Sequence, residues 1–288
     1  MQTYRISWKG HCLELGSKTQ VMGILNTTPD SFSDGGHFFR PEEAVIQGQK
    51  MFEAGADIID IGGESTKPFS EPVSIEEETR RVIPVIEKLA RLLPVPISID
   101  TTKTVIARRA IDVGACIIND ISAMKSDPDM ASFAAESKVP VILMHMKGTP
   151  KSMQVSPQYD DLVKEVRDFF KSVIADAREH GVDESKIIID PGIGFGKTMA
   201  HNLMLINNLE KFQELNVPIL VGTSRKSFIR KLLKSPAEKD IPPDLPIVET
   251  GTQATVAASI INGAHIVRVH DVTNTCATVK IIDAIKNA

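Results

Sequence analysis

Charged side chains that could bind a ligand or stabilise charge are spread along the chain. Three cations in its second half, Lys226, Arg268 and His270, form a set suited to an anionic group such as a phosphate or diphosphate. Three further residues carry carboxylate or amide groups: Asp100, Asn119 and Asp190. A carboxylate with an amide can read the donor and acceptor edge of a heterocycle, and one carboxylate can stabilise developing positive charge. The residue types leave both uses open.

Short apolar runs rich in β-branched residues precede most of these side chains. Such runs alternate with longer segments of helical period, which is typical of repeated βα units. The expected strands are residues 20–25, 57–61, 96–100, 115–119, 139–144, 186–190, 217–222 and 265–269. The expected helices include residues 41–54, 75–93, 103–113, 160–180 and 252–262. Because the strand segments are too short and too apolar to be amphipathic helices, we expect parallel strands that are buried on both faces.

Eight βα units predict an α/β fold, a single (β/α)8 TIM barrel that spans residues 1–288. The alternative is a doubly wound open sheet, which usually carries G-x-G-x-x-G after its first strand. Here the first strand leads into Asn26 and Thr-Thr-Pro-Asp instead. The Pro-rich and charged residues 235–246 are expected to be an insertion loop rather than a domain boundary.

Barrel enzymes place their chemistry at the carboxyl ends of the strands, and the polar residues of this chain gather there. A single Asp or Asn after a strand is more often a helix cap or a turn residue. Asp100 is followed by two better caps, Thr101 and Thr102, whereas Asp190 precedes Pro-Gly and could belong to a structural turn. His145 could equally be a histidine of the core.

The glycine-rich segment 192–198 resembles a phosphate-binding loop at first sight. It fails the motif because Pro191 stands where the first glycine is needed, and proline has no backbone N–H for a phosphate. We expect its glycines to let the backbone pass close to a flat ligand, with Phe195 available to stack. Two long connections, residues 27–40 and 62–74, are expected to act as lids.

Composition excludes several classes of protein. The 288 residues hold 33 Lys and Arg against 37 Asp and Glu, a net charge of −4, so no basic stripe for nucleic acid is present. The three cysteines form no C-x-x-C pair, which favours a reducing cytoplasm. Since no apolar run reaches the roughly 20 residues of a membrane span, we expect no membrane partner.

Several short motifs, in fixed order, resemble those of the bacterial dihydropteroate synthase family. They lie at residues 22–36, 62–66, 98–101, 118–120, 143–146, 190–197, 224–227 and 268–272. The resemblance implies a cytoplasmic transferase of folate biosynthesis and a sulfonamide target. It implies condensation of 6-hydroxymethyl-7,8-dihydropterin diphosphate with 4-aminobenzoate, by an SN1-like path, to 7,8-dihydropteroate and diphosphate. It also implies Mg²⁺ as cofactor and a homodimer packed through barrel helices.

The resemblance assigns roles to individual residues of this sequence. The implied pterin site consists of Asp100, Asn119, Met144, Asp190, Phe195, Gly222 and Lys226. The implied diphosphate site consists of Asn26, Arg268 and His270, and Asn26 also reaches the metal. The implied 4-aminobenzoate site consists of Thr66, Pro68, Phe195 and Ser224. The residues implied to be catalytic are Asp100, Lys226 and Asn26.

One departure from the family pattern bears on the second lid. The family usually continues Arg-Pro-Gly after Ser-Thr, whereas this chain has Lys67, Pro68 and Phe69. Lysine lacks the bidentate fork of arginine, and phenylalanine does not share the conformational freedom of glycine. A catalytically silent pterin-binding paralogue is therefore one alternative. A pterin-binding methyltransferase domain is another, although it has no diphosphate for Asn26, Arg268 and His270 to bind.

Overall fold

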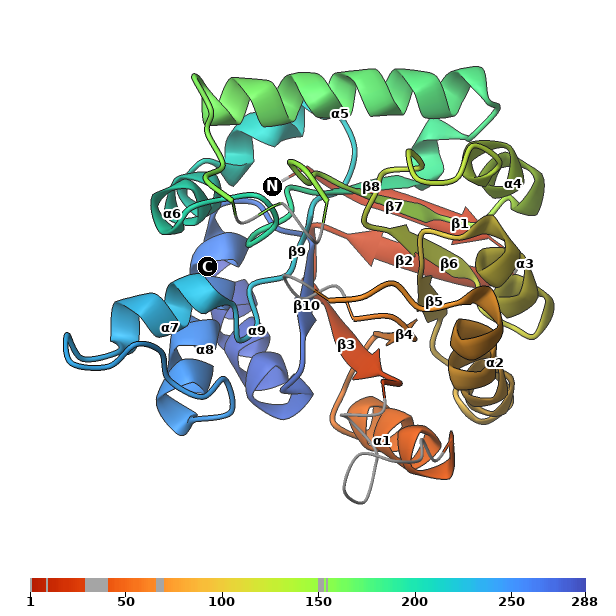
Figure 1. The fold of residues 1–288 in the computed structure, drawn as a ribbon, viewed down its shortest axis with the longest axis horizontal. Coiled ribbons are helices and arrows are strands. Elements are labelled where there is room, and N and C mark those ends of the chain that lie inside the picture. Colours follow the sequence, from red (N-terminus) through yellow and green to blue (C-terminus); the bar gives the residue numbers. More distant parts are fainter. Residues whose placement is uncertain (1, 9, 29–40, 66–69, 150–152, 154) are drawn as a thin grey trace.

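Eight parallel strands form the centre of the molecule, and helices surround them (Figure 1). The computed structural model describes residues 2–8, 10–28, 41–65, 70–149, 153 and 155–288. The barrel strands are β3 (Gln20–Asn26), β4 (Ile58–Gly62), β5 (Ile97–Asp100), β6 (Ile117–Asp120), β7 (Val141–Met144), β8 (Ile187–Asp190), β9 (Leu220–Val221) and β10 (Ile266–Val269). Their order is β8-β7-β6-β5-β4-β3-β10-β9, and a parallel bridge between Ile189 and Ile219 joins the two edges. The predicted TIM barrel is confirmed.

The helices follow the strands in alternation, as the sequence pattern predicts. They are α1 (Pro41–Glu53), α2 (Ile75–Leu92), α3 (Thr104–Asp112), α4 (Met130–Ser137), α5 (Leu162–Glu179), α6 (Met199–Asn207), α7 (Ser227–Leu233), α8 (Pro246–Ile261) and α9 (Val272–Lys286). Two 3₁₀ segments are η2 (Glu184–Lys186) and η3 (Leu209–Leu215). None of the helices among the described residues is long and apolar enough to cross a membrane.

Two elements differ most from the sequence prediction in their boundaries. Helix α8 begins at Pro246 rather than at residue 252, because proline is tolerated at the first helical position, where no N–H partner is needed. Strand β9 is restricted to Leu220–Val221 instead of residues 217–222. Pro218 cannot donate to a strand ladder, and only its carbonyl takes part, by accepting from the N–H of Ile189.

An antiparallel hairpin, β1 (Tyr4–Trp8) with β2 (His11–Leu15), precedes the barrel and was not predicted. Its alternation of buried and exposed residues is the period of a strand with one buried face. His265, at the amino-terminal end of β10, contacts the Gln2 carbonyl through Nε2 at 3.1 Å and the N–H of Ile219 through Nδ1 at 3.1 Å. The chain start therefore lies at the end of the barrel opposite to the carboxyl ends of the strands.

Helix α9 is tied to the start of the first barrel strand by a buried carboxylate. Asp283 accepts from the backbone N–H of Thr19 at 2.8 Å and from its hydroxyl at 2.7 Å. Both residues are buried, so neither polar group of Thr19 has water as a substitute partner. The last helix of the barrel is thereby joined to its first strand.

We expect Asp283→Ala to lower the free energy of unfolding by about 3 kcal/mol, because it leaves two buried donors unsatisfied. Asp168→Ala is the matched control: Asp168 makes an exposed pair with Lys164, and we expect its loss to cost about 0.5 kcal/mol. Urea unfolding of both variants measures the difference. Equal losses would contradict the structural role of Asp283.

Candidate active site

Four neighbouring strands align their polar ends in one row. Asn26 pairs in register with Gly62, Gly62 with Asp100, and Asp100 with Asn119. Gly62 contributes no side chain, and a Cβ there would lie 3.4 Å from the Cβ of Asp100. The predicted residues Asn26, Asp100 and Asn119 therefore lie together at the carboxyl ends of the strands, which we call the barrel mouth.

Arg268 lies on β10, beside β3, and its side chain reaches the carboxylates of β4 and β5. Its Nε donates to Asp60 Oδ2 at 2.6 Å, and its Nη2 donates to Asp100 Oδ2 at 2.8 Å. Asn119 Nδ2 also donates to Asp60 Oδ2, at 3.1 Å. Arg268 thus lies between two carboxylates at the floor of the mouth.

Asp60 is a residue of this site that the sequence analysis missed. It lies in the middle of β4 and is fully buried. The signal was present, because Asp60 is the one charged residue in an otherwise apolar strand of five. A buried charge is costly unless it is paired, and a charged residue inside an apolar strand therefore indicates a partner elsewhere in the chain.

Asp100 is poised to change its charge near neutral pH. Burial raises the pKa of Asp100 to about 7, against the opposing effect of the Arg268 cation, and the nearby Asp60 carboxylate adds to the rise. Arg268 stays charged, because both carboxylates raise its pKa against the effect of burial. The floor of the mouth thus holds a fixed cation beside a titratable carboxylate.

The other half of the mouth is formed by Asp190, Phe195 and Lys226. Asp190 ends β8 and pairs in register with Met144 of β7. Lys226 Nζ lies 4.0 Å from the centre of the Phe195 ring. Burial, together with the Arg268 charge, lowers the pKa of Lys226 to about 8, and burial raises the pKa of Asp190. A flat polar ligand would meet a carboxylate, an ammonium group and an aromatic ring here.

The glycine-rich turn after β8 is shaped by neighbouring backbone. Gly192 and Gly196 have φ angles of +68° and +63°, and a Cβ would lie 1.9 Å from the His145 carbonyl oxygen and 2.4 Å from that of Lys147, respectively. The N–H of Gly192 is already bonded to Asp190 Oδ1 at 2.7 Å. The backbone that follows β7 thus requires glycine at these two positions, and the expectation that the turn passes close to a flat ligand stays a prediction.

Ser224 and His270 form a hydrogen-bonded pair on the side of β9 and β10. Ser224 Oγ lies 2.9 Å from His270 Nδ1, and the His270 N–H donates to Ser224 Oγ at 3.2 Å. Gly222 directly follows β9, and a Cβ there would be 3.8 Å from the Cβ of Arg268. One residue expected to bind diphosphate, His270, is thus directly linked to one expected to bind 4-aminobenzoate, Ser224.

Some of the predicted positions lie outside the described residues. They are residues 29–40 of the first expected lid, and Thr66, Lys67, Pro68 and Phe69 of the second.

The start of the second expected lid is held by a partly buried network of charges, in which Glu78 is the buried member. Lys103 Nζ donates to a carboxylate oxygen of Glu64 and, at 2.5 Å, to Glu78 Oε2. Thr101 Oγ1 donates to Glu78 Oε1 at 2.7 Å. Thr101 therefore binds Glu78, and the first turn of α3 is capped instead by Asp127, which accepts from the N–H of Thr104 at 2.8 Å.

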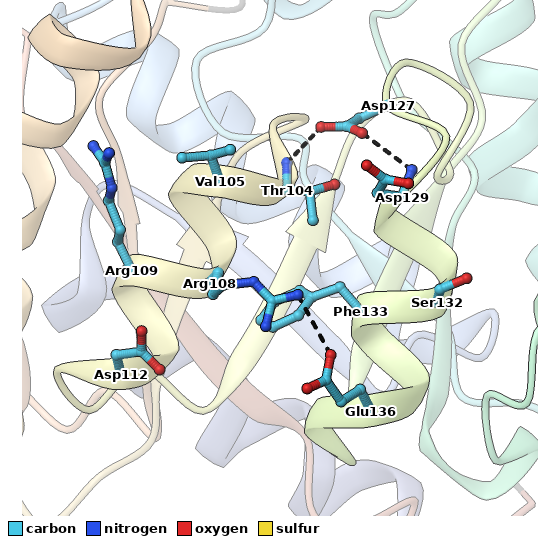
Figure 2. A pocket seen from close by; sticks show the side chains of 10 residues that line it. All are labelled: Thr104, Val105, Arg108, Arg109, Asp112, Asp127, Asp129, Ser132, Phe133 and Glu136. Carbon is cyan, nitrogen blue, oxygen red and sulfur yellow. Dashed lines mark hydrogen bonds and ion pairs between the residues drawn. The ribbon is translucent and has the colours of Figure 1, made fainter.

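Two cavities lie at different places on the barrel. One of about 120 Å³ opens at the mouth, beside Asp100. A groove of about 390 Å³ lies on the outside between α3 and α4 (Figure 2). In that groove Arg108 already pairs with Glu136 at 3.4 Å and lies 4.4 Å from the Phe133 ring centre. Because the smaller cavity lies at the carboxyl ends of the strands, we place the chemistry at the mouth.

Comparison with known proteins gives concordant results. Residues 22–270 match the family described as pterin binding enzyme. The chain is 48% identical to the dihydropteroate synthase of Synechocystis sp. over 94% of this chain and 91% of the relative. It is 46% identical to that of Escherichia coli over 97% and 96%, respectively.

Solved structures agree with these relatives. Dihydropteroate synthase of Yersinia pestis, in a sulfonamide drug complex, has a TM-score of 0.91 and 42% identity, with 99% of this chain and 100% of that chain covered. Dihydropteroate synthase of Xanthomonas albilineans, in complex with 7,8-dihydropteroate, has a TM-score of 0.87 and 40% identity, with 99% of each chain covered.

We expect Asp60→Asn to lower the free energy of unfolding by about 3 kcal/mol, because it replaces a buried acceptor of Arg268 with a neutral amide. Glu136→Gln, the same change in the exposed pair with Arg108, should cost less than about 1 kcal/mol. Thermal and urea unfolding measure both. A loss at Asp60 no greater than at Glu136 would show that the buried contact is not structurally important.

Proposed function

Since the chain belongs to the pterin binding enzymes, and among them to the dihydropteroate synthase family, we propose that it joins 6-hydroxymethyl-7,8-dihydropterin diphosphate to 4-aminobenzoate. The products are 7,8-dihydropteroate and diphosphate. The observation that carries the assignment is the buried contact of Arg268 with Asp100, within the row that also holds Asn26 and Asn119. This arrangement places groups that can bind the pterin ring, neutralise the diphosphate and stabilise the developing cation at the same barrel mouth.

The ring of the pterin fits the half of the mouth with Asp190, Phe195 and Lys226. A pterin presents N–H donors and a ring carbonyl, which match carboxylate acceptors and an ammonium donor. Asn119 and Met144 would complete the pocket on the neighbouring strands, with Gly222 beside Arg268. Phe195 contributes a flat apolar surface for stacking.

The diphosphate fits the cationic side of the mouth. Arg268 and His270 would neutralise it. A guanidinium has five N–H donors, and its contacts with Asp60 and Asp100 use two of them, so Arg268 keeps donors for the diphosphate. The described residues include no group of three or more His, Cys, Asp or Glu that could bind a metal ion by themselves. This suits Mg²⁺, which commonly binds through substrate phosphates and few protein ligands, and the Asn26 amide at the mouth would provide one. When bound, Mg²⁺ would neutralise charge on the leaving diphosphate.

The proposed reaction breaks the bond between the pterin methylene carbon and the diphosphate oxygen before the amine attacks. The electron pair leaves with diphosphate, and the cation that remains is delocalised into the ring and stabilised by the ionised form of Asp100. Lys226 holds the ring in place. The neutral arylamine then forms the C–N bond with its free lone pair, and the ammonium that results passes its proton to water, so the attack needs no general base. Ser224, with Thr66 and Pro68, would hold 4-aminobenzoate, and Phe195 would lie between the two substrates.

We further propose a cytoplasmic homodimer. All three cysteines are free, in keeping with a reducing compartment. Helices α7 and α8 contact each other and expose large apolar residues, which a second copy could cover. These residues are Leu232, Leu233, Ile247 and Ile261.

With Mg²⁺ and both substrates, we expect the purified protein to form dihydropteroate, with only weak release of diphosphate when 4-aminobenzoate is left out. A coupled synthesis assay measures both products, and a sulfonamide should compete with 4-aminobenzoate. Pterin binding without product at any 4-aminobenzoate concentration would favour the silent paralogue. Methyl transfer from a methyl-tetrahydrofolate would favour the methyltransferase alternative.

We expect Asp100→Asn to lower kcat by at least about 100-fold and to change the KM for the pterin diphosphate far less, because cation stabilisation acts in the transition state. Steady-state kinetics of the wild type and the variant measure the two constants. Equal losses in binding and turnover would contradict this role.

The pH profile tests the same carboxylate. The active form is ionised, so wild-type kcat/KM should fall as the pH drops below about 7, where Asp100 takes up its proton. Asp100→Asn should lack this acidic limb. Retention of the limb in the variant would assign the titration to another group.

A further inference from the structure

Lys197 is a buried lysine at the end of the glycine-rich turn, and the reaction outlined above does not use it. It is 2% exposed. Its Nζ lies 2.9 Å from His145 Nδ1, 2.9 Å from the Phe195 carbonyl oxygen and 3.3 Å from the His145 carbonyl oxygen. Three acceptors match the three N–H donors of an ammonium group. Lys197 therefore binds the end of β7 and the turn after β8 to each other.

The charged groups around Lys197 are few. Burial lowers the pKa of Lys197 to about 7, Asp190 on β8 opposes this effect, and Lys226 before α7 adds to it. On α6, burial lowers the pKa of His201, and the charge of Lys197 lowers it further. Helix α5 presents an apolar ring, because the imidazole of His145 packs edge-on against Phe169 with the centroids 4.8 Å apart.

His145 lets the contact persist on both sides of neutral pH. Burial, with the charges of Lys197, Lys147 and Lys125, lowers the pKa of His145 to about 2, so its imidazole is neutral. In one tautomer Nδ1 accepts from the ammonium form of Lys197, and in the other Nδ1–H donates to the amine form. Tyr159, whose ring lies 6.2 Å from that of His145, remains un-ionised at neutral pH, since burial raises its pKa. The histidine that the sequence left undecided is thus a core residue with a defined partner.

The contacts of Lys197 join it to Phe195 and Asp190, two residues of the proposed pterin pocket. The Phe195 carbonyl that it binds belongs to the residue whose ring lies against Lys226. The other end of the contact is equally fixed, because the N–H of His145 donates to the Asp190 carbonyl at 2.9 Å. Loss of the ammonium group would leave two buried carbonyls without this donor, and the turn would have to shift to reach water.

We propose that Lys197 is a positioning residue for the pterin: by binding His145 and the Phe195 carbonyl, it holds the Phe195 ring and Asp190 in the arrangement that receives the ring. This inference rests on the proposed function only in the identity of the ligand. It predicts a large effect on the pterin side of the reaction and a much smaller one on the 4-aminobenzoate side, which shares only Phe195 with the pterin site.

The test compares Lys197→Met with Lys147→Met. Lys147 is a nearby lysine, 45% exposed, that pairs with Glu165, so its replacement is the same chemical change outside the pocket. We expect Lys197→Met to weaken the binding of a pterin without diphosphate, measured by calorimetry, and to raise the KM for the pterin diphosphate, each by about tenfold or more. The KM for 4-aminobenzoate should stay within about threefold, and Lys147→Met should leave all three constants within about twofold of the wild type.

A merely structural role would give a different result: a lower melting temperature and a smaller active fraction, with unchanged pterin affinity and unchanged KM values. That outcome in folded Lys197→Met would overturn the proposal. Calorimetry also separates this inference from the proposed function, because a wild type that binds pterin but makes no product would fail the function while the comparison of affinities stands.

A second pair of variants decides the matter if Lys197→Met does not fold. His145→Asn keeps an acceptor near the Nδ1 position, whereas His145→Leu removes it. We expect His145→Leu to weaken pterin binding by about tenfold relative to His145→Asn, since a buried donor of Lys197 loses its partner. Equal affinities in the two variants would overturn the proposal.

Discussion

The buried contact of Arg268 with Asp60 and Asp100 is the interaction on which the site depends. A guanidinium group taken out of water is stable only where acceptors surround it, and two carboxylates and a closed barrel provide that environment here. The same contact sets the chemistry of Asp100, because the Arg268 cation offsets part of the cost of ionising a buried carboxylate. A cation for the leaving group and an anion for the developing carbocation are thus held in one hydrogen-bonded unit.

The side chains in the two halves of the mouth are held in place in different ways. On the side of β3 to β6, Asn26, Asp100 and Asn119 lie in register on β3, β5 and β6, with Gly62 of β4 between the first two, so that backbone pairing keeps them in one row. On the side of β8, the pocket wall depends on a turn whose glycines pass close to neighbouring backbone. A strand end is positioned by its backbone hydrogen bonds to neighbouring strands, whereas a turn needs side-chain contacts to hold it. Lys197 makes such a contact with the Phe195 carbonyl.

Much of the fold was predictable because periodicity and chemistry agree along the chain. Apolar runs of strand length, each followed by a helical segment, predict the barrel, and the carboxyl ends of its strands identify the mouth. The hairpin of residues 4–15 was not predicted, although its alternation of buried and exposed residues is the period of a strand with one buried face. Asp60 was not predicted because the functional residues of a barrel are expected at strand ends, and Asp60 lies in the middle of its strand. A charge at such a position nevertheless indicates a partner elsewhere in the chain.

The sequence by itself determined the order of strands and helices, the types of chemical group at the mouth and the likeness to dihydropteroate synthases. Only the tertiary structure decided which groups meet, since Asp60 and Arg268 are 208 positions apart and their contact depends on closure of the barrel. It also decided their charge states: burial brings the pKa values of Asp100 and Lys197 to about 7 from opposite directions. Desolvation is a property of the surroundings in space, and neighbours in sequence do not reveal it.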